Sequence, residues 1–495
     1  GRIGLVDHAV PERHLEKAAR SLIREDPGAR RPGWRQRAAG SWPLRRVVAP
    51  YLKSRTEDRA PPAHYPAPYA LVDLWSDHAR HPERQQEAEA RSVSRLLTGD
   101  TAQNLIRAFQ LQERLKGLGR RTEHGVQRVH VVGAGVMGGD IAAWCATQGL
   151  TVSLQDTGPE RIAGAVKRAH RLFRDRLKDR RRVTAAMDRL MPDPRAAGVE
   201  KADLVIEAIT EDGDAKRGLY SDLEPRLAPD ALLATNTSSI PLEELAPALA
   251  RPERLVGLHF FNPVAKMQLV EVVTGEPTAG ETADRACAFA RRIGRLPVTV
   301  ASSPGFLVNR VLMPYLLEAV TLVEEGTDPA TVDRAATGFG MPMGPVELAD
   351  SVGLDVCLSV AEILAGHFGG RVPEALRQRV AAGDLGRKTG RGFYSYHRGR
   401  ALKGRPGQPG GEVRDRLLLP LLNESVRCLR EGVVDDTDLL DAGVIYGTGF
   451  APFRGGPVHH IRQTGRATLK GRLEDLAQSH GDRFRPDAGW EALRL

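Results

Sequence analysis

The chain has 495 residues, which is too long for one hydrophobic core and predicts two to four domains. Its 41% hydrophobic and 27% charged residues are typical of a soluble globular protein, and no apolar run approaches the ~20 residues that span a bilayer. The net charge of +9 comes from basic residues that are mixed with acidic ones and lack interleaved aromatics, which argues against nucleic-acid binding. A solvated surface explains the surplus positive charge, and an anionic small-molecule substrate explains it as well.

Residues 1–122 are expected to form a mostly helical linker. The proline-rich stretch Pro61–Pro68 predicts a stiff extended segment, and helical periodicity follows over Glu87–Leu97 and Ala102–Leu118. The chain opens on Gly1 and not on a methionine, so we expect a fragment or a processed chain. No basic-then-apolar signal for export opens it.

The most informative segment follows the apolar run Val129–Val132, where Gly133, Gly135 and Gly138 form a Gly-x-Gly-x-x-Gly motif. The first glycine permits a tight turn, the second lets the backbone approach a pyrophosphate, and the third allows close helix–strand packing. A helix of small residues is expected over residues 139–146, and its N-terminus presents free N–H groups to phosphates. This segment predicts a dinucleotide site.

The next strand-like run ends in Asp156, about twenty residues after the motif. A carboxylate there accepts both ribose hydroxyls, which favours NAD over the 2′-phosphorylated cofactor. Short apolar runs alternate with helical patterns over the domain expected at residues 123–302, which predicts an α/β fold with a mainly parallel sheet covered on both faces. The runs are Val129–Val132, Thr151–Gln155, Asp203–Ile209, Ala231–Thr235, Leu255–Phe260, Leu269–Val273 and Pro297–Ala301. A separate run, Arg171–Arg182, alternates charges on what is expected to be one solvated helix.

Polar residues lie at the carboxyl ends of three of these runs, where ligands bind in open α/β sheets. They are Thr210, Glu211 and the later Lys216; Asn236 to Ser239; and His259 with Asn262. Glu271 lies in the run after His259, and the two side chains can meet if the connecting loop folds back.

Singly, His259 fits a core residue and Glu271 an exposed strand position. Behind a dinucleotide fold, the pair fits a general base whose tautomer is fixed by a carboxylate. Oxidation of an alcohol by NAD requires such a base, and Ser238 can hydrogen-bond the same hydroxyl.

The pattern becomes helical after Pro304, and an internal repeat appears. Pro314, Glu318 and Glu325 recur as Pro420, Glu424 and Glu431 at an offset of 106 residues, and the Gly338–Pro345 segment is echoed over Gly447–Pro457. A duplicated all-α unit is therefore expected, with copies at 303–398 and 399–495 and a loop over 383–411 between them.

The cysteines lie far apart, with neither CxxC spacing nor a nearby histidine cluster, which predicts buried thiols in a reducing, cytoplasmic compartment. They are Cys145, Cys287, Cys357 and Cys428. No metal site is expected, because His459-His460 lacks partners at useful spacing.

Over residues 126 to about 470 the chain resembles the L-3-hydroxyacyl-CoA dehydrogenase family, in the form found in multifunctional fatty-acid oxidation α-subunits. The matching segments are Gly133–Gly138, Thr235–Ser239, His259–Pro263, Leu269–Val273 and Pro304–Arg310. Their order and spacing together are highly specific, because other dehydrogenases share the glycine loop without the His-Phe-Phe-Asn-Pro segment and the following Glu.

The resemblance implies NAD as cofactor, an acyl-CoA substrate and a role for each candidate residue. His259 would be the catalytic base and Glu271 its partner, while Ser238 and Asn309 would contact the substrate's hydroxyl and acyl oxygens. Tyr446, before the second Gly-x-Gly-Phe segment, would also contact substrate. The NAD site would be lined by Gly133, Gly135, Val136, Met137, Gly138, Asp156, Glu211, Lys216, Asn236, Ser238 and Asn262.

Gly1–Asp7 and Val10-Pro11 resemble the closing segment of a crotonase-type enoyl-CoA hydratase domain. The hydratase core is missing, so either the chain is truncated or the hydratase is supplied elsewhere. The resemblance also implies a homodimer, with a thiolase β-subunit as a further partner. The alternatives are a silent scaffold subunit that docks a thiolase, a nucleic-acid binder, and a dehydrogenase for a non-CoA hydroxyacid. The retained His259, Glu271, Ser238 and Asn309 argue against the scaffold.

Overall fold

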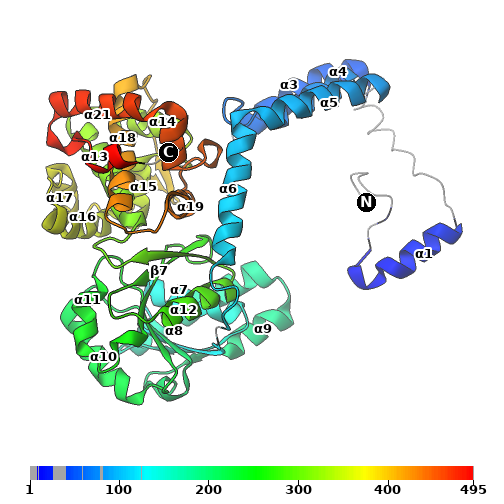
Figure 1. Ribbon diagram of the computed structural model, residues 1–495. Helices are drawn as coiled ribbons and strands as arrows, with labels where there is room; N and C mark the ends of the chain where they lie inside the picture. The colour runs from blue at the N-terminus through cyan, green and yellow to red at the C-terminus, as the bar shows by residue number, and fades with distance from the viewer. Residues whose placement is uncertain are drawn as a thin grey trace. The chain divides into compact units, whose positions relative to one another are not determined.

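The computed structural model describes residues 8, 10–25, 41–57, 59–78, 82–123 and 125–493. The chain divides into two compact units, residues 1–103 and 104–495 (Figure 1). The hydratase-like segment Gly1–Asp7 lies outside the described residues. No helix in the described part of the chain is both long and apolar enough to cross a bilayer.

The described part of the first unit is helical. Residues Pro61–Tyr65 form hydrogen-bonded turns, in which the Tyr65 N–H donates to the Pro61 carbonyl at 2.9 Å, so the expected extended stretch is wrong here. The prolines still fit, because they accept at these turns and need no N–H of their own. The helices are η1 (Glu12–His14), α1 (Leu15–Glu25), α3 (Trp42–Glu57), α4 (Ala67–His78) and α5 (Pro82–Thr98), and α6 (Asp100–Gly117) continues into the second unit.

The second unit begins with an eight-stranded sheet in the order β3-β2-β1-β4-β5-β6-β7-β8. Neighbouring strands pair in parallel except β6 and β7, which are antiparallel. The α/β expectation is confirmed, although the short edge strand β3 was not predicted. The strands are β1 (Arg128–Val132), β2 (Thr151–Gln155), β3 (Leu190–Pro192), β4 (Leu204–Glu207), β5 (Leu232–Thr235), β6 (Leu255–Phe260), β7 (Leu269–Thr274) and β8 (Leu296–Ala301).

Helices cover both faces of this sheet (Figure 1). Buried side chains of α7 (Val136–Thr147), α8 (Pro159–Leu177) and α12 (Gly280–Arg292) form one core cluster with the sheet. Those of α6, α10 (Gly213–Leu223) and α11 (Leu242–Leu245) belong to the cluster on the other face. Shorter elements are α9 (Arg180–Arg189), η2 (Val199–Lys201), η3 (Glu224–Arg226), η4 (Ala246–Ala248) and η5 (Pro252–Arg254).

The charged run Arg171–Arg182 was expected to form one helix, and this prediction is wrong. Helix α8 ends at Leu177, Lys178 adopts a left-handed conformation with φ of 60°, and Asp179 caps α9 by accepting from the Arg182 N–H at 2.9 Å. The aspartate that interrupts the basic run is therefore an N-cap, a position that favours Asp because its carboxylate satisfies a free N–H.

The helical region carries the predicted repeat as reciprocal ion pairs between α13 (Val308–Glu324) and α18 (Gly411–Arg430). Arg310 of α13 donates to Glu424, at 2.7 Å, and to Glu431. Arg416 donates to Glu318, at 2.7 Å, and to Glu325, at 2.6 Å. Each pair of glutamates identified from the sequence thus binds the arginine of the other copy.

A second pair of equivalent carboxylates begins a helix in each copy. Asp333 accepts from the Val346 N–H at 2.9 Å, and Asp441 accepts from the Val458 N–H at 2.7 Å. The preceding glycines are required, because a Cβ at Gly344 or Gly456 would collide with these aspartates. The remaining elements are α14 (Pro329–Phe339), α15 (Pro345–Val352), α16 (Leu354–Phe368), α17 (Glu374–Ala381), β9 (Ser395–His397), β10 (Arg400–Leu402), α19 (Thr437–Thr448), η6 (Pro452–Arg454), α20 (Pro457–Thr464), α21 (Arg466–His480), η7 (Asp482–Phe484) and α22 (Gly489–Ala492).

The four cysteines are buried free thiols, as the sequence predicts. Burial raises the pKa of Cys145, Cys287 and Cys357 to about 12 and raises that of Cys428 further.

Acid is expected to destabilise the second unit through His460. Burial, with Arg454 and Arg414, lowers the pKa of this imidazole to about 4. The unfolded chain binds a proton near pH 6.5, so it takes up more protons than the folded chain between the two values, and stability falls as the pH drops from about 6.5 to about 4. Urea titrations should show His460→Gln losing roughly 3 kcal/mol less than the wild type over this window. The exposed His367→Gln should follow the wild type, and equal pH dependence in all three proteins would contradict the assignment.

Candidate active site

His259 and Glu271 lie opposite each other on the antiparallel strands β6 and β7. The imidazole Nδ1 is 2.6 Å from the carboxylate Oε2, and the residues are 5% and 0% exposed. An ionised carboxylate only accepts, so Nδ1 carries the hydrogen and Nε2 keeps a free lone pair. The structure therefore brings the two residues together in the geometry of an oriented base.

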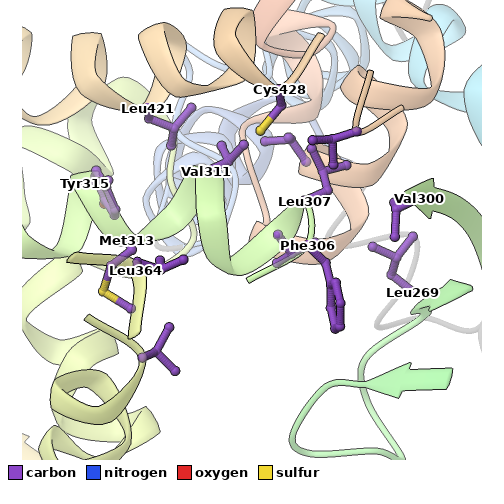
Figure 2. Close-up of a cluster of buried hydrophobic side chains, with 14 of the residues drawn as sticks. Leu269, Val300, Phe306, Leu307, Val311, Met313, Tyr315, Leu364, Leu421 and Cys428 are labelled. Carbon is purple, nitrogen blue, oxygen red and sulfur yellow. The ribbon is translucent and has the colours of Figure 1, made fainter. Parts of the chain in front are cut away.

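The other oxygen of Glu271 binds the start of the first C-terminal helix. Its Oε1 accepts from the Leu307 N–H at 3.0 Å and from the Val308 N–H at 2.8 Å. Gly305 and Phe306, with φ of 75° and 51°, form the left-handed turn that leads into these two N–H groups. Figure 2 shows Phe306 and Leu307 in an apolar cluster with side chains of β7, β8 and α18. Glu271 thus links the sheet to α13.

Two aromatic rings flank the imidazole of His259. The Phe261 ring centroid is 4.4 Å away and the Phe306 centroid is 5.7 Å away. Both rings pack against the imidazole of the 5% exposed His259, and burial of this kind strengthens its electrostatic interaction with Glu271. Neither aromatic residue was identified as a site residue from the sequence.

Glu211 organises the loop after β5. Its Oε1 accepts from the Thr237 hydroxyl at 2.6 Å, from the Ser238 N–H at 2.8 Å and from the Ser239 hydroxyl at 3.1 Å. Burial raises the pKa of Glu211, but Lys216 and these hydrogen bonds lower it by more, so the net shift is downward. The Ser238 hydroxyl, 3.2 Å from Oε1, is held at the carboxyl edge of the sheet.

Lys216 is buried below this loop and not exposed at the site. Its Nζ is 2.7 Å from Glu207 Oε1 and 3.4 Å from Glu211 Oε2, and the residue is 1% exposed. Glu207 also accepts from the hydroxyls of Tyr220 and Thr235. Sequence reasoning missed Glu207, although an acidic residue inside the apolar run Asp203–Ile209 was a usable signal.

The remaining polar candidates differ in how they are held. Asn236 Oδ1 accepts from the Phe260 N–H at 2.9 Å, and Asn309 donates to the Ser238 carbonyl at 3.2 Å. Asn262 is exposed in the loop after β6. Tyr446 donates its hydroxyl to the Ala108 carbonyl of α6 at 2.7 Å, and within the described residues no hydrogen bond joins it to the His259 cluster.

Comparison with known proteins assigns the family. Residues 128–303 match the family model of the 3-hydroxyacyl-CoA dehydrogenase NAD binding domain, and residues 305–396 match that of the C-terminal domain. The fatty acid oxidation complex subunit alpha of Shewanella amazonensis is 33% identical over 99% of this chain and 74% of its own length. The chain belongs to the 3-hydroxyacyl-CoA dehydrogenase family.

Other relatives of this dehydrogenase agree. The subunit alpha of Psychrobacter cryohalolentis is 33% identical over 94% of the chain and 70% of its own length. The solved 3-hydroxybutyryl-CoA dehydrogenase of Escherichia coli K12 has a TM-score of 0.66 at 27% identity and covers 74% of this chain and 98% of its own. That of Ralstonia eutropha has a TM-score of 0.52 at 37% identity and covers 55% and 100%. The chain is therefore an NAD-binding oxidoreductase.

The glycine loop of the dehydrogenase fits NAD. A Cβ at Gly133 would collide with the Ala208 carbonyl and one at Gly138 with the Gly133 carbonyl, whereas a Cβ at Gly135 would meet nothing within 4 Å. The first and third glycines are thus needed for packing, and the second faces the open side where a phosphate approaches. Val136 is 56% exposed beside it and Met137 is half-buried.

Asp156 completes this part of the dehydrogenase. Its carboxylate accepts from the Ala134 N–H at 2.7 Å and the Gly158 N–H at 2.9 Å, which fixes it beside the glycine loop with lone pairs left for ribose hydroxyls. Within the described residues no group of three His, Cys, Asp or Glu is arranged to hold a metal ion.

Proposed function

We propose that the chain oxidises L-3-hydroxyacyl-CoA to 3-ketoacyl-CoA in fatty-acid β-oxidation, with NAD as oxidant and His259 as general base. The single observation that carries the assignment of the base is the 2.6 Å contact of His259 Nδ1 with buried Glu271, which leaves Nε2 as the proton acceptor. The family supports the substrate class, and the dyad supports the residue roles.

The chain's residues divide the work of the reaction. NAD, when bound, accepts the hydride from C3 of the substrate. His259 takes the 3-hydroxyl proton at Nε2, and Glu271 holds the ring in the required tautomer and stabilises its protonated form. Ser238 and Asn309 hydrogen-bond the substrate oxygens and so position the substrate. Proton transfer to a positioned base such as His259 contributes ~10²- to 10⁴-fold to the rate.

The cofactor is held at the carboxyl edge of the sheet. The glycine loop with Val136 and Met137 receives the pyrophosphate, and Asp156 receives the adenosine ribose. Asn236, Ser238 and Asn262 line the nicotinamide end. Glu211 acts mainly by holding the Ser238 loop, since it accepts from the Ser238 N–H, and Lys216 acts through Glu211 because it pairs with both Glu207 and Glu211.

Further proposals concern organisation and partners. We propose a crotonase-type closing segment plus a helical linker over residues 1–122, the NAD-binding domain over 123–302 and helical copies over 303–398 and 399–495. Tyr446 is kept as a substrate contact. We propose a cytoplasmic homodimer that pairs with a thiolase β-subunit. The related proteins are named as alpha subunits of a fatty acid oxidation complex, which supports assembly with further subunits. The alternative is a silent scaffold subunit of such a complex.

A substrate panel tests the proposal. Purified protein with 3-hydroxyacyl-CoAs of several chain lengths should form NADH from NAD, with kcat/KM for NADP at least about tenfold lower because Asp156 repels the 2′-phosphate. NADH formation is followed by absorbance. A folded protein that binds NAD but forms no NADH from any chain length would instead support the scaffold.

A further inference from the structure

The loop Phe261–Gln268, which carries Asn262, is held by two arginines from outside the loop. Arg295 donates from Nη2 to the Val264 carbonyl at 2.7 Å, and Arg176 of α8 donates to the Ala265 carbonyl at 2.5 Å. Val264 is 1% exposed, whereas Asn262 is exposed. The loop is thus anchored at its buried centre while its asparagine stays accessible.

Arg295 also contacts the helix that follows the glycine loop. The guanidinium carbon of Arg295 lies 3.7 Å from the ring centroid of Trp144, which belongs to α7. Arg295 itself is 6% exposed. The Trp144 indole N–H donates to the Ile293 carbonyl at 2.8 Å, which fixes the ring. One stack of two side chains therefore joins the cofactor helix to the loop that carries Asn262.

Burying the guanidinium of Arg295 here lowers the stability of the fold, so stability by itself does not explain the arrangement. Arg295 has no acidic partner in the described chain, its Nε is buried without a hydrogen-bond partner, and Arg176 lies over the same indole at 5.9 Å. Burial, with the charge of Arg176, lowers the pKa of Arg295 to about 10. An apolar residue would fill this space without a buried unpaired charge. The guanidinium, however, both stacks on the indole and donates to a carbonyl, which few side chains can do.

We propose that Arg295 and Trp144 are positioning residues that fix the Phe261–Gln268 loop against α7, so that Asn262 meets NAD bound at the glycine loop. This inference rests on the proposed function, in which Asn262 lines the cofactor site. The stack holds the two halves of that site, the glycine loop and the asparagine, in one register. Trp144 contributes through its ring face, and Arg295 contributes through both its plane and its N–H groups.

A double-mutant cycle tests this inference, with KM for NAD, kcat and thermal unfolding measured for each variant. Arg295→Met should raise KM for NAD about tenfold and lower kcat by less, because the loop loses its anchor while the His259–Glu271 pair stays paired. In the double variant with Asn262→Ala, Arg295→Met should raise KM for NAD little further, since both substitutions remove the same contact of Asn262 with NAD. Arg295→Lys should recover only part of the loss, because an ammonium donates but does not stack as a plane.

The matched control is Arg292→Met. Arg292 is the last residue of α12, three residues before Arg295, and it also donates to a backbone carbonyl, that of Gln148 at 3.0 Å, but it is exposed and outside the site. Its KM and kcat should equal those of the wild type. If Arg295→Met does not fold, Trp144→Phe weakens the same stack and should shift KM in the same direction by a smaller factor.

The outcomes separate this inference from the proposed function. If Asn262→Ala leaves KM for NAD unchanged, the cofactor role proposed for Asn262 fails. If Asn262→Ala raises KM but the effects of Arg295→Met and Asn262→Ala multiply in the double variant, Arg295 does not act through Asn262 and the inference is overturned.

Discussion

Replacing His259 by alanine is expected to lower kcat for 3-hydroxyacyl-CoA oxidation by ~10²- to 10⁴-fold, the scale of lost general-base catalysis. The affinity for NAD should stay nearly unchanged, because the hydrogen bonds that fix Asp156 beside the glycine loop, from the Ala134 and Gly158 N–H groups, do not involve His259. The fold should also persist, since Glu271 still accepts from two backbone N–H groups. Stopped-flow NADH formation at saturating substrate, with NAD binding by fluorescence titration, measures both quantities.

The control for this change is His170→Ala, which removes an exposed imidazole from α8. Its kcat should remain within about twofold of the wild type, because the ring is outside the site. Equal turnover in His259→Ala and His170→Ala would refute the assignment of the base.

Glu271→Gln is expected to reduce kcat by a similar ~10²- to 10⁴-fold factor with little change in size. The amide NH₂ donates to Nδ1 of His259, so the proton is forced onto Nε2 and the lone pair that would accept the substrate proton is lost. The loss should appear in kcat more than in KM. The exposed Glu276→Gln on the loop after β7 provides the matched control and should behave as the wild type.

Glu271→Ala should add a loss of stability that Glu271→Gln lacks. Without any acceptor, the buried N–H groups of Leu307 and Val308 and the Nδ1–H of His259 are left unsatisfied. This costs roughly 3–5 kcal/mol of unfolding free energy. Urea unfolding of the two variants compares these costs, and equal stability of alanine and glutamine would contradict the role of Glu271 as the link to α13.

The sequence predicted that His259 and Glu271 could meet if the connecting loop folds back, and the structure brings them together. His259 and Glu271 are on consecutive strands, and an antiparallel turn between them fixes their register. The hydrogen bonds from the Leu307 and Val308 N–H groups could not be predicted in the same way. Every residue except proline carries a backbone N–H, so the residue type does not show which one donates. The burial of Lys216 depends on Glu207, whose orientation requires the packed sheet.

Local surprises have equally specific causes. The hairpin β9–β10 turns through Arg398 and Gly399, with φ of 49° and 75°. Tight hairpins of this kind usually carry Asn or Asp at the first position, so an arginine there gave little signal. The break after α8 likewise depends on a left-handed Lys178, which sequence propensities disfavour. By contrast, the repeated glutamates of α13 and α18 were visible because a duplicated pattern preserves spacing.

The pH dependence of kcat/KM in the wild type and in His259→Ala tests the central claim most directly. The wild-type oxidation rate should fall on the acid side, because a protonated imidazole cannot accept the hydroxyl proton. The residual activity of His259→Ala should lack this acid limb. An acid limb of the same shape and position in both proteins would show that another group takes the proton.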